Sequence, residues 1–456
     1  MAISSRASDV ARSPQQPWTT WGGSASCTPA HRFAARSVDD VVTVVRRARM
    51  LGLTVRAVGA GHSFSPVATT DGVLPPLDAL DHVDRPVRLP APEGRVTHEV
   101  RVGAGIRLHA LNDALASHGL ALSNLGDIDR QSVAGAISTG THGTGGDSGT
   151  GAGLAAQVRA VEVVVADGSV VRASRHENTE LFEAARLGLG ALGILVAVTV
   201  GAEPAYVLEA REEPWPLERA LEAVADGSFL ASDHAELYWF PHTRTALTKR
   251  NARRALDDAP LDALRGWVDD ELLSNGVFEL TNRLAQAVPA AIPAINRVSA
   301  RALGARRFTA PSHEVFVSQR RVRFVESEWA VPLDTIGDVL RDVQDWFART
   351  DERVSFPVEV RFARADDVWL STSYGRPTAY VAVHQFWRTN ASRYFAAVQE
   401  IASAYDGRPH WGKIHTLGAE RLRGLYPRFD DFLAVRDGVD PDGVFTNRYL
   451  ERVLGR

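Results

Sequence analysis

Periodic apolar positions near the start of the chain predict a helix, a strand and a glycine-rich turn in succession. Ser37 is a suitable N-cap, and the valines that follow it repeat at helical spacing as far as Gly52. The apolar run 53–58 is typical of a short strand. It leads into residues 59–63, where two glycines would let the backbone approach a ligand closely.

Short segments with strand and helix patterns continue to about residue 206, and together they indicate one α+β domain. An Asp-Gly pair at 167–168 stands between two apolar runs and predicts a β-hairpin. The further expected elements are a strand at 100–102, a helix at 108–118, a loop at 124–129, strands at 158–165 and 169–173, a helix at 179–186 and a strand at 194–200.

Longer periodic segments fill the second half of the chain. Strands of this kind, separated by amphipathic helices, are typical of an antiparallel sheet with helices on one side. The expected elements are strands at 324–329, 354–361 and 380–386 and helices at 333–348 and 392–404.

These changes of pattern divide the chain into four parts. We expect a loose tail at 1–17, a first domain at 18–206, a second domain at 207–435 and a C-terminal segment at 436–456. The C-terminal segment is expected to pack back on the first domain. Residues 251–307 indicate helices and loops without a defined arrangement.

The composition is that of a soluble, folded protein. Of 456 residues, 45% are hydrophobic and 23% are charged, which argues against disorder. The net charge of −4 provides no positive field for phosphate groups, so a nucleic-acid partner is not expected. The only cysteine, Cys27, allows neither an internal disulfide nor a thiolate zinc site.

Membrane and export signals are weak in the sequence. The first 17 residues lack the continuous apolar run of a signal peptide. The longest apolar stretch, 187–202, contains four glycines and is shorter than the roughly 20 residues that a spanning helix needs. We expect a cytoplasmic protein without a transmembrane segment, and peripheral attachment to a membrane stays open.

Lysine is rare in this chain, since all but two of the 51 lysine and arginine residues are arginine. A lysine in such a chain raises the question of whether its position requires an ammonium group that an arginine guanidinium could not replace. We interpret Lys249 as chance retention at a surface site. Lys413 stands beside aromatic and imidazole residues, which favours a functional role.

Two glycine-rich stretches bear on cofactor binding. Residues 188–193 match the G-x-G-x-x-G fingerprint, but a predicted helix precedes them and a strand follows, which is the inverse of a nicotinamide Rossmann site. Residues 135–146 hold so many small and hydroxyl residues that we expect no core there. Their backbone amides would be available to a diphosphate. With residues 59–63, they give one domain two loops suited to a dinucleotide held in a different manner.

The histidines suggest no metal site. None of the 14 occurs in an HExxH motif or at another obvious metal-ligand spacing, so a metallohydrolase is disfavoured and no metal is expected. A lone histidine is more often a hydrogen-bonded structural residue than a functional one. This applies to His62, His142, His410 and His415, of which His62 lies in the first glycine-rich turn.

Charged residues alternate with apolar ones on the predicted strand 354–361. Glu359 and Arg361 point to one face, and aromatic and valine side chains fill the other. On a solvated face the pair would be an ordinary surface charge match. The next strand carries His384, and Lys413 follows further along. Converging on one sheet face, these groups could hold a polyhydroxy substrate and stabilise a developing alkoxide.

Four motifs carry a family resemblance. They are Gly59-Ala60-Gly61-His62-Ser63-Phe64, Gly140-Thr141-His142-Gly143-Thr144-Gly145, Glu359-Val360-Arg361-Phe362 and Gly407-Arg408-Pro409-His410-Trp411-Gly412-Lys413. Together with the tail from Leu425 to Leu450 they resemble the sugar-1,4-lactone oxidases, the aldonolactone oxidoreductases of the vanillyl-alcohol-oxidase-type flavoprotein superfamily. The resemblance extends over nearly the whole chain.

The resemblance implies a two-domain α+β fold, with an FAD-binding domain of the vanillyl-alcohol-oxidase (PCMH) type and an antiparallel-sheet substrate domain, or cap. His62 falls at the position that carries a covalent bond to the flavin 8α-methyl group. By the same resemblance, the other residues expected to contact FAD are Gly59, Ala60, Gly61, Ser63, Phe64, Gly126, Ser132, Gly135, Thr139, Thr141, His142, Gly145, Gly193, Ile194 and His410.

The resemblance also implies a substrate site. Glu359, Arg361 and Lys413 fall where the related alditol oxidases contact substrate hydroxyls, and His384 belongs to the same expected set. Asp127 falls where those oxidases place a serine, so the chemistry of that contact differs. Gly126 falls at a position where a small residue admits oxygen, which favours an oxidase.

The implied reaction is FAD-dependent oxidation of a sugar 1,4-lactone, such as L-gulono-, L-galactono- or D-arabinono-1,4-lactone, at its C2 hydroxyl by hydride transfer to flavin N5. Lys413 and Arg361 would lie near that hydroxyl, and Glu359 would hold Arg361 in place. Electrons would pass to O2 or to an acceptor such as a quinone or cytochrome. Two alternatives stay open: an alditol oxidase acting on xylitol or sorbitol, and a flavin-binding protein without sugar turnover.

Overall fold

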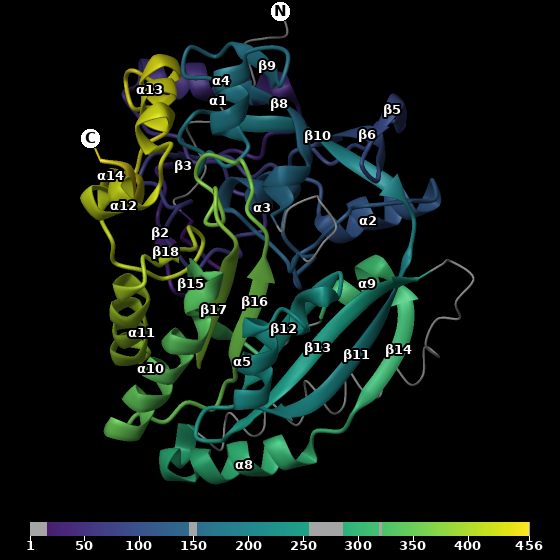
Figure 1. Ribbon diagram of the computed structural model, residues 1–456. Helices are drawn as coiled ribbons and strands as arrows, with labels where there is room; N and C mark the ends of the chain where they lie inside the picture. The colour runs from purple at the N-terminus through teal and green to yellow at the C-terminus, as the bar shows by residue number, and fades with distance from the viewer. Residues whose placement is uncertain (1–15, 146–152, 255–285, 319–321, 456) are drawn as a thin grey trace, which may run out of the picture.

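Two large sheets organise the chain, and each lies against its own hydrophobic core (Figure 1). The computed structural model describes residues 16–145, 153–254, 286–318 and 322–455. The first sheet lies in the upper half of Figure 1 and the second in the lower half. β10 (Ile194–Pro204) ends in the first sheet just before β11 (Val207–Pro216) begins in the second.

The first sheet is antiparallel and has the strand order β5-β6-β10-β8-β9, with β7 paired to the end of β10. β10 lies at its centre and is buried almost throughout, which explains its unbroken apolar sequence. The other strands are β5 (Val87–Glu93), β6 (Val96–Gly103), β7 (Leu120–Ala121), β8 (Val158–Val164) and β9 (Val170–Ser174). The short pairs outside it are β1 (Trp18–Thr19) with β2 (Ser26–Cys27) and β3 (His31–Arg32) with β4 (Val73–Leu74).

The helices and the hairpin predicted for this domain are confirmed within a few residues. Ser37 caps the first helix, since its hydroxyl accepts a hydrogen bond from the Asp40 N–H. Gly168, with a φ of +83°, forms the turn between β8 and β9. The helices are α1 (Val38–Met50), α2 (Leu108–Ser117), α3 (Val133–Thr139) and α4 (Thr179–Ala185), with the 3-10 turn η2 (Leu154–Gln157).

The strand predicted at 53–58 is wrong. Only isolated parallel bridges form there, from Val55 to Val73 and from Val58 to Pro76. Residues 75 and 76 are prolines, which have no N–H to donate and therefore interrupt the ladder.

The expectation that 135–146 contributes nothing to the core is also wrong for its first part. Ala136 and Ile137 are buried in the first core as part of α3, which packs against β10. Small side chains allow this helix to approach the sheet closely, so their density reflects packing as well as ligand access. Residues 146–152 lie outside the described residues.

The second sheet is antiparallel, with the order β14-β11-β13-β12-β16-β17-β15-β18. The strand predicted to begin at 354 begins at 358, because Pro357 cannot donate to the ladder. Its further strands are β12 (His234–Trp239), β13 (Thr245–Arg254), β14 (Arg306–Pro311), β15 (Phe324–Pro332), β16 (Val358–Ala363), β17 (Thr378–Phe386) and β18 (Arg408–Pro409).

Helices cover one face of the second sheet, as predicted, and leave the other face towards the first domain (Figure 1). Val358, Val360 and Phe362 join the core beneath these helices. The alternating residues Glu359 and Arg361 therefore point to the opposite face. The elements on this face are α5 (Leu217–Ala225), α8 (Ile292–Ala302), α10 (Ile336–Arg349) and α11 (Ser392–Ala404), with η3 (Phe229–Ala231), η5 (Pro289–Ala291) and η6 (Leu333–Thr335). α9 (Ser312–Phe316) lies on the opposite face, where its residues Val315 and Phe316 belong to the first core.

The C-terminal segment lies beside the first domain, where its yellow helices adjoin the purple and blue elements of Figure 1. Phe445 and Leu450 belong to the first core, and the Val55 N–H donates to the carbonyl of Val444. α14 (Arg448–Leu454) lies within this segment, α13 (Phe429–Val439) runs into its start, and α12 (Ala419–Leu425) precedes it. Among the described residues, we find no helix whose length and apolar character would suit a membrane span.

Candidate active site

A long cavity runs through the first domain. The space outside the protein atoms there is about 920 Å³, a figure that includes open solvent. Its walls come from the turn 59–63, from α3, from the loop 189–195 and from Phe445 of the C-terminal segment. None of the described residues that line it is acidic, so the walls would not repel a diphosphate.

Glycines let the backbone come close to this cavity. A β-carbon at Gly59 would lie 1.8 Å from Ser132 Oγ, and one at Gly193 would lie 2.5 Å from the Val164 carbonyl oxygen. Gly61 and Gly193 also have φ values of +69° and +146°, which L side chains rarely adopt. The wall therefore offers backbone and small hydroxyl groups, which fits the resemblance-based expectation of FAD.

Arg56 lines the long cavity and holds several segments of its wall together. Its guanidinium is buried and donates to the carbonyl oxygens of Val67, Leu189, Gly190 and Phe445 at 2.6–3.0 Å. Burial lowers the pKa of Arg56 to about 10, and the group remains charged at neutral pH. One side chain thus joins the backbone at Val67, the 189–190 loop and the C-terminal segment.

A second, polar cavity of about 550 Å³ lies between the two domains. Its charged lining residues are Asp127, Glu328, Arg361 and Lys413. Four residues, His62, Ser63, Gln131 and Thr139, line both cavities. A ring bound at this junction would face the long cavity on one side and the charged groups on the other.

Arg361 on β16 lies among three carboxylates. Its guanidinium is 3.0 Å from Asp127, pairs with Glu359, and is 3.5 Å from Glu236 on β12. Burial lowers the pKa of Arg361, but the three carboxylates outweigh that effect and hold the pKa well above its ordinary value. Arg361 is therefore a permanent cation whose orientation depends on all three partners.

Lys413 lies on the loop after β18, on the other side of the polar cavity. Its ammonium group pairs with Glu326 and lies 5.2 Å from the centre of the Phe64 ring. Glu326 is also 3.6 Å from His384, which in turn is 3.9 Å from Glu359. The ammonium and the guanidinium are thus linked through buried carboxylates and one imidazole.

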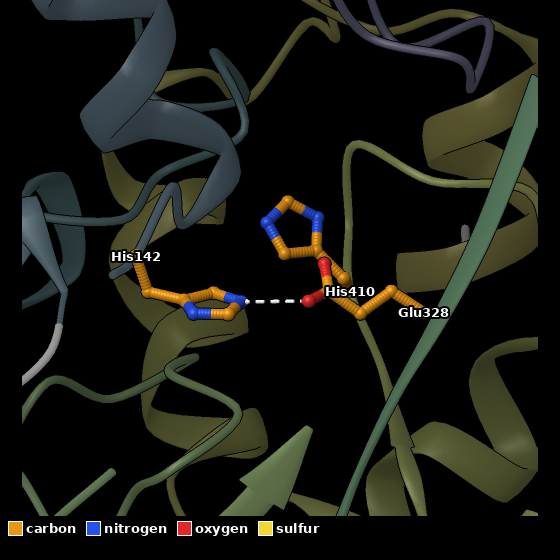
Figure 2. Close-up of side chains that lie close together, drawn as sticks. All are labelled: His142, Glu328 and His410. Carbon is orange, nitrogen blue, oxygen red and sulfur yellow. Dashed lines mark ion pairs between the residues drawn. The ribbon is translucent and has the colours of Figure 1, made fainter. Parts of the chain in front are cut away.

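His142, Glu328 and His410 form a separate buried cluster (Figure 2). His142 Nε2 lies 3.2 Å from Glu328, and its ring stacks on Tyr380 with centroids 3.6 Å apart. Burial alone would raise the pKa of Glu328, but the charge and hydrogen bond of His142 hold it well below its ordinary value.

The geometry of this cluster favours an ion pair over a metal site. His410 Nδ1 accepts a hydrogen bond from the Gly412 N–H at 3.0 Å, and the ring also bonds to the backbone of Gly140. Burial lowers the pKa of His410 to about 3, so the ring is neutral at pH 7. Both of its nitrogens are engaged by backbone, which leaves no lone pair aimed at a cation.

His62 lies at the junction of the two cavities, with its ring centre 5.7 Å from that of Trp21. Burial, followed by the charges of Arg107, Lys413 and Arg130, lowers the pKa of His62 to about 4. The imidazole is therefore neutral at pH 7 and keeps a nucleophilic lone pair.

The sequence-predicted residues fall into three groups in space. Those lining the long cavity are Gly59, Ala60, Gly61, His62, Ser63, Ser132, Gly135, Thr139, Gly193 and Ile194. Those lining the polar cavity are His62, Ser63, Phe64, Asp127, Thr139, Thr141, His142, Arg361, His410 and Lys413.

Four predicted residues lie outside both linings. Glu359 and His384 are behind Arg361 and Glu326, as their ion pairs show. A β-carbon on Gly126 would lie 3.0 Å from Thr141 Cγ2, so Gly126 is directly behind the polar cavity. The Gly145 N–H donates to the Phe362 carbonyl at 2.9 Å, a contact between the two domains.

Three acidic residues of the site were missed by the sequence analysis: Glu236, Glu326 and Glu328. Glu326 and Glu328 are two residues apart on a strand that was predicted, so the period of two places them on one face. The same alternation identified Glu359 and Arg361 and could have identified this pair.

Comparison with known proteins agrees with the resemblance stated from the motifs. The profile of the D-arabinono-1,4-lactone oxidase family matches residues 198–453, and a profile described as an FAD binding domain matches residues 29–174. The chain is 38% identical over 438 residues to L-gulono-1,4-lactone dehydrogenase of Mycobacterium tuberculosis, covering 96% of this chain and 99% of that one.

Two further relatives match over similar lengths. L-gulonolactone oxidase of Scyliorhinus torazame is 32% identical, with 95% of this chain and 97% of that one covered. Alditol oxidase of a Streptomyces species is 34% identical, with 96% and 98% covered.

The fold is shared with solved cholesterol oxidases. Cholesterol oxidase from Brevibacterium sterolicum superposes with a TM-score of 0.79 over 97% of both chains at 18% identity, which shows a shared fold. The predicted two-domain α+β fold with an FAD-binding domain is thus confirmed.

Proposed function

Because the chain belongs to the D-arabinono-1,4-lactone oxidase family of FAD-linked oxidoreductases, we propose that it oxidises a sugar 1,4-lactone at the C2 hydroxyl group. The observation that carries this proposal is the junction at His62, where a long cavity whose described lining residues include no acidic one meets a polar cavity containing Arg361 and Lys413. FAD is assigned to residues 18–206 and the C-terminal segment, and substrate recognition to residues 207–435.

The chemistry is divided between cofactor and protein. FAD, when bound, accepts the hydride from C2. Arg361 and Lys413 are catalytic residues in this proposal, because two cations in a largely buried site would stabilise negative charge on the C2 oxygen as its proton passes to solvent in the polar cavity. Glu359 holds Arg361, and Asp127 provides a carboxylate that can accept hydrogen bonds from the other lactone hydroxyls.

His62 is proposed as the covalent attachment point of the flavin. It lies at the junction of the cavities, and burial keeps its imidazole neutral with a pKa of about 4. A nitrogen lone pair is what a bond to the flavin methyl carbon requires.

Electrons leave the protein for O2 or for another acceptor such as a quinone or cytochrome. The support for O2 comes from the family resemblance, in which a small residue at the position of Gly126 admits oxygen; a β-carbon there would lie 3.0 Å from Thr141 Cγ2 and 3.1 Å from the His142 carbonyl oxygen. The proposed location is cytoplasmic or peripheral at a membrane surface.

The test is anaerobic mixing of the purified flavoprotein with L-gulono-1,4-lactone, D-arabinono-1,4-lactone and xylitol. Rapid loss of the oxidised flavin absorbance with a lactone is the expected result, since only hydride transfer bleaches the flavin. Faster bleaching by xylitol would replace the proposal with alditol oxidation. No bleaching by any of the three would indicate a flavin protein without sugar turnover.

A further inference from the structure

Charges of alternating sign follow one row across five strands of the second sheet. Arg306 on the edge strand β14 stands opposite Glu212 of β11, which stands opposite Lys249 of β13. Lys249 stands opposite Glu236 of β12, and Glu236 stands opposite Arg361 of β16. Directly opposite residues in a sheet point to the same face, so the row is continuous.

The contacts along this row are short. Arg306 lies 2.5 Å from Glu212, Lys249 Nζ lies 3.2 Å from Glu236, and Glu236 lies 3.5 Å from Arg361. The side-chain exposure falls from 39% at Arg306 to 8–14% at the four inner residues. The row therefore runs from the open edge of the sheet to the polar cavity.

Lys249, interpreted from the sequence as a chance surface residue, is a buried member of this row. That interpretation is wrong, because the alternation of β13 turns its side chain inward. Its ammonium group also donates to the Val315 carbonyl at 3.1 Å. Burial lowers the pKa of Lys249, but Glu236 and Glu212 outweigh this and raise it above its ordinary value.

Both lysines of an otherwise arginine-based chain thus lie in the charge networks around one cavity. Lys413 lines the polar cavity, whereas Lys249 is connected to Arg361 only through Glu236. The compact ammonium of Lys249 lies 3.2 Å from Glu236 and donates to a backbone carbonyl, while the charge of Glu212 acts on it from further away; a planar guanidinium cannot make such contacts as readily.

Glu236 is shared between Lys249 and Arg361. When Lys249 is charged, the Glu236 carboxylate interacts with both cations. Arg361 is then held less strongly by Glu236 and keeps its ion pairs with Asp127 and Glu359. Without that ammonium, Arg361 would be the nearest cation to a buried carboxylate, and Glu236 would draw the guanidinium away from the cavity.

We infer that Lys249 and Glu236 are positioning residues that hold Arg361 in the orientation required for lactone binding. This inference rests on the proposed function, since it assigns the role of Arg361 to the lactone. Neither residue lines the polar cavity, so both act through the guanidinium.

The experiment compares Lys249→Met, Glu236→Gln and the double variant with the unaltered flavoprotein, using the lactone that it oxidises fastest. Lys249→Met is expected to raise KM about tenfold, equivalent to about 1.4 kcal/mol, with a smaller change in kcat. The double variant removes both charges, so it is expected to recover a KM within about threefold of the unaltered protein. A purely structural role for Lys249 would make the double variant as poor as, or poorer than, the single one.

A second readout separates binding from turnover. The Kd of the same lactone is obtained from the concentration dependence of anaerobic flavin reduction in a stopped-flow instrument. We expect this Kd to follow the same order as KM, because Arg361 contributes to binding before reaction. If Lys249→Met folds poorly, Glu236→Gln keeps the inference testable, with a smaller increase in KM expected since Arg361 keeps two carboxylates.

Arg250→Met is the matched control. Arg250 is the next residue on β13, points to the opposite face, pairs with Glu213 and packs on Trp215. Its loss is expected to leave KM unchanged. Equal KM values for Lys249→Met and Arg250→Met would overturn the inference alone, whereas absence of lactone turnover in the unaltered flavoprotein would overturn the proposed function and the inference with it.

Discussion

At the scale of single residues, Lys413 is the side chain whose removal should separate chemistry from cofactor binding. Lys413→Ala deletes a cation from the polar cavity and leaves Glu326 without its ammonium partner, while no wall of the long cavity changes. We expect the rate of flavin reduction by the lactone to fall by about 100-fold or more, as when one electrostatic group of an active site is lost. Stopped-flow absorbance under anaerobic conditions measures this rate.

The flavin content of the same variant is the control for Lys413. It should equal that of the unaltered protein, because the residues lining the cofactor cavity are intact. Lys413→Arg keeps the charge but spreads it over a planar group, and an intermediate rate is expected. An unchanged rate in Lys413→Ala would remove this residue from the catalytic site.

His62 allows a second test at the same scale, concerning attachment rather than turnover. After acid precipitation, the unaltered protein should keep yellow flavin in the pellet, whereas His62→Ala should release it to the supernatant. The neutral imidazole, with its pKa lowered to about 4 by burial, is the nucleophile in this prediction. Absorbance of both fractions is the measurement, with His82→Ala, on an exposed position of the same domain, as the control. Flavin retained in the pellet of His62→Ala would assign the covalent bond to another residue.

At the scale of elements, Arg56 determines whether three separate segments form one cavity wall. Arg56→Met removes the hydrogen bonds to four carbonyl oxygens, and although Val67 keeps a bond from Asn447 Nδ2, the carbonyls of Leu189, Gly190 and Phe445 lose the Arg56 donor. We expect the free energy of unfolding to fall by about 3 kcal/mol or more, because several buried polar groups lose their hydrogen bonds together. FAD affinity should fall as well, since the 189–190 loop and Phe445 line the cavity.

Chemical denaturation and flavin content together test this prediction for Arg56. Arg49→Met is the matched control, because Arg49 also reaches the C-terminal segment but through an exposed pair with Asp442. An exposed pair contributes about 0–1 kcal/mol, so the control should stay close to the unaltered protein. Equal losses in the two variants would contradict the role assigned to Arg56.

Elements were predictable from the sequence wherever their own residues determine them. Ser37 caps α1 locally, and the alternation around Glu359 and Arg361 selects one face of β16 without help from distant segments. The prolines at 75, 76 and 357 interrupted or shortened strands, because they have no N–H to donate to the neighbouring strand. The apolar pattern of a predicted strand does not reveal this requirement. Motifs and their resemblance located the candidate site, while the roles of Glu236 and Lys249 depend on a sheet order that no local pattern encodes.

At the scale of the whole molecule, the site exists only because two cores are joined. The domains meet where β10 passes into β11, and the C-terminal segment returns to the first core. Asp127 from the first domain pairs with Arg361 from the second, and Thr144 accepts a hydrogen bond from His234 on β12. Charges and hydrogen bonds across this boundary make the stability of the fold and the geometry of the site interdependent.

The stability of the whole fold should therefore depend on pH through its buried histidines. Burial lowers the pKa of His234 to about 4 and the pKa values of His410 and His415 to about 3. In the unfolded chain each would titrate near 6.5, so below that pH the unfolded state binds protons that the folded state does not. The free energy of unfolding should then fall with decreasing pH between 6.5 and about 4, by about 1.4 kcal/mol per pH unit for each such histidine. Urea unfolding at pH 7, 6 and 5 measures how the free energy of unfolding changes with pH. His415→Gln should reduce this slope by the contribution of one histidine, about 1.4 kcal/mol per pH unit. A slope that this substitution leaves unchanged would show that His415 is protonated in the folded state, contrary to its burial.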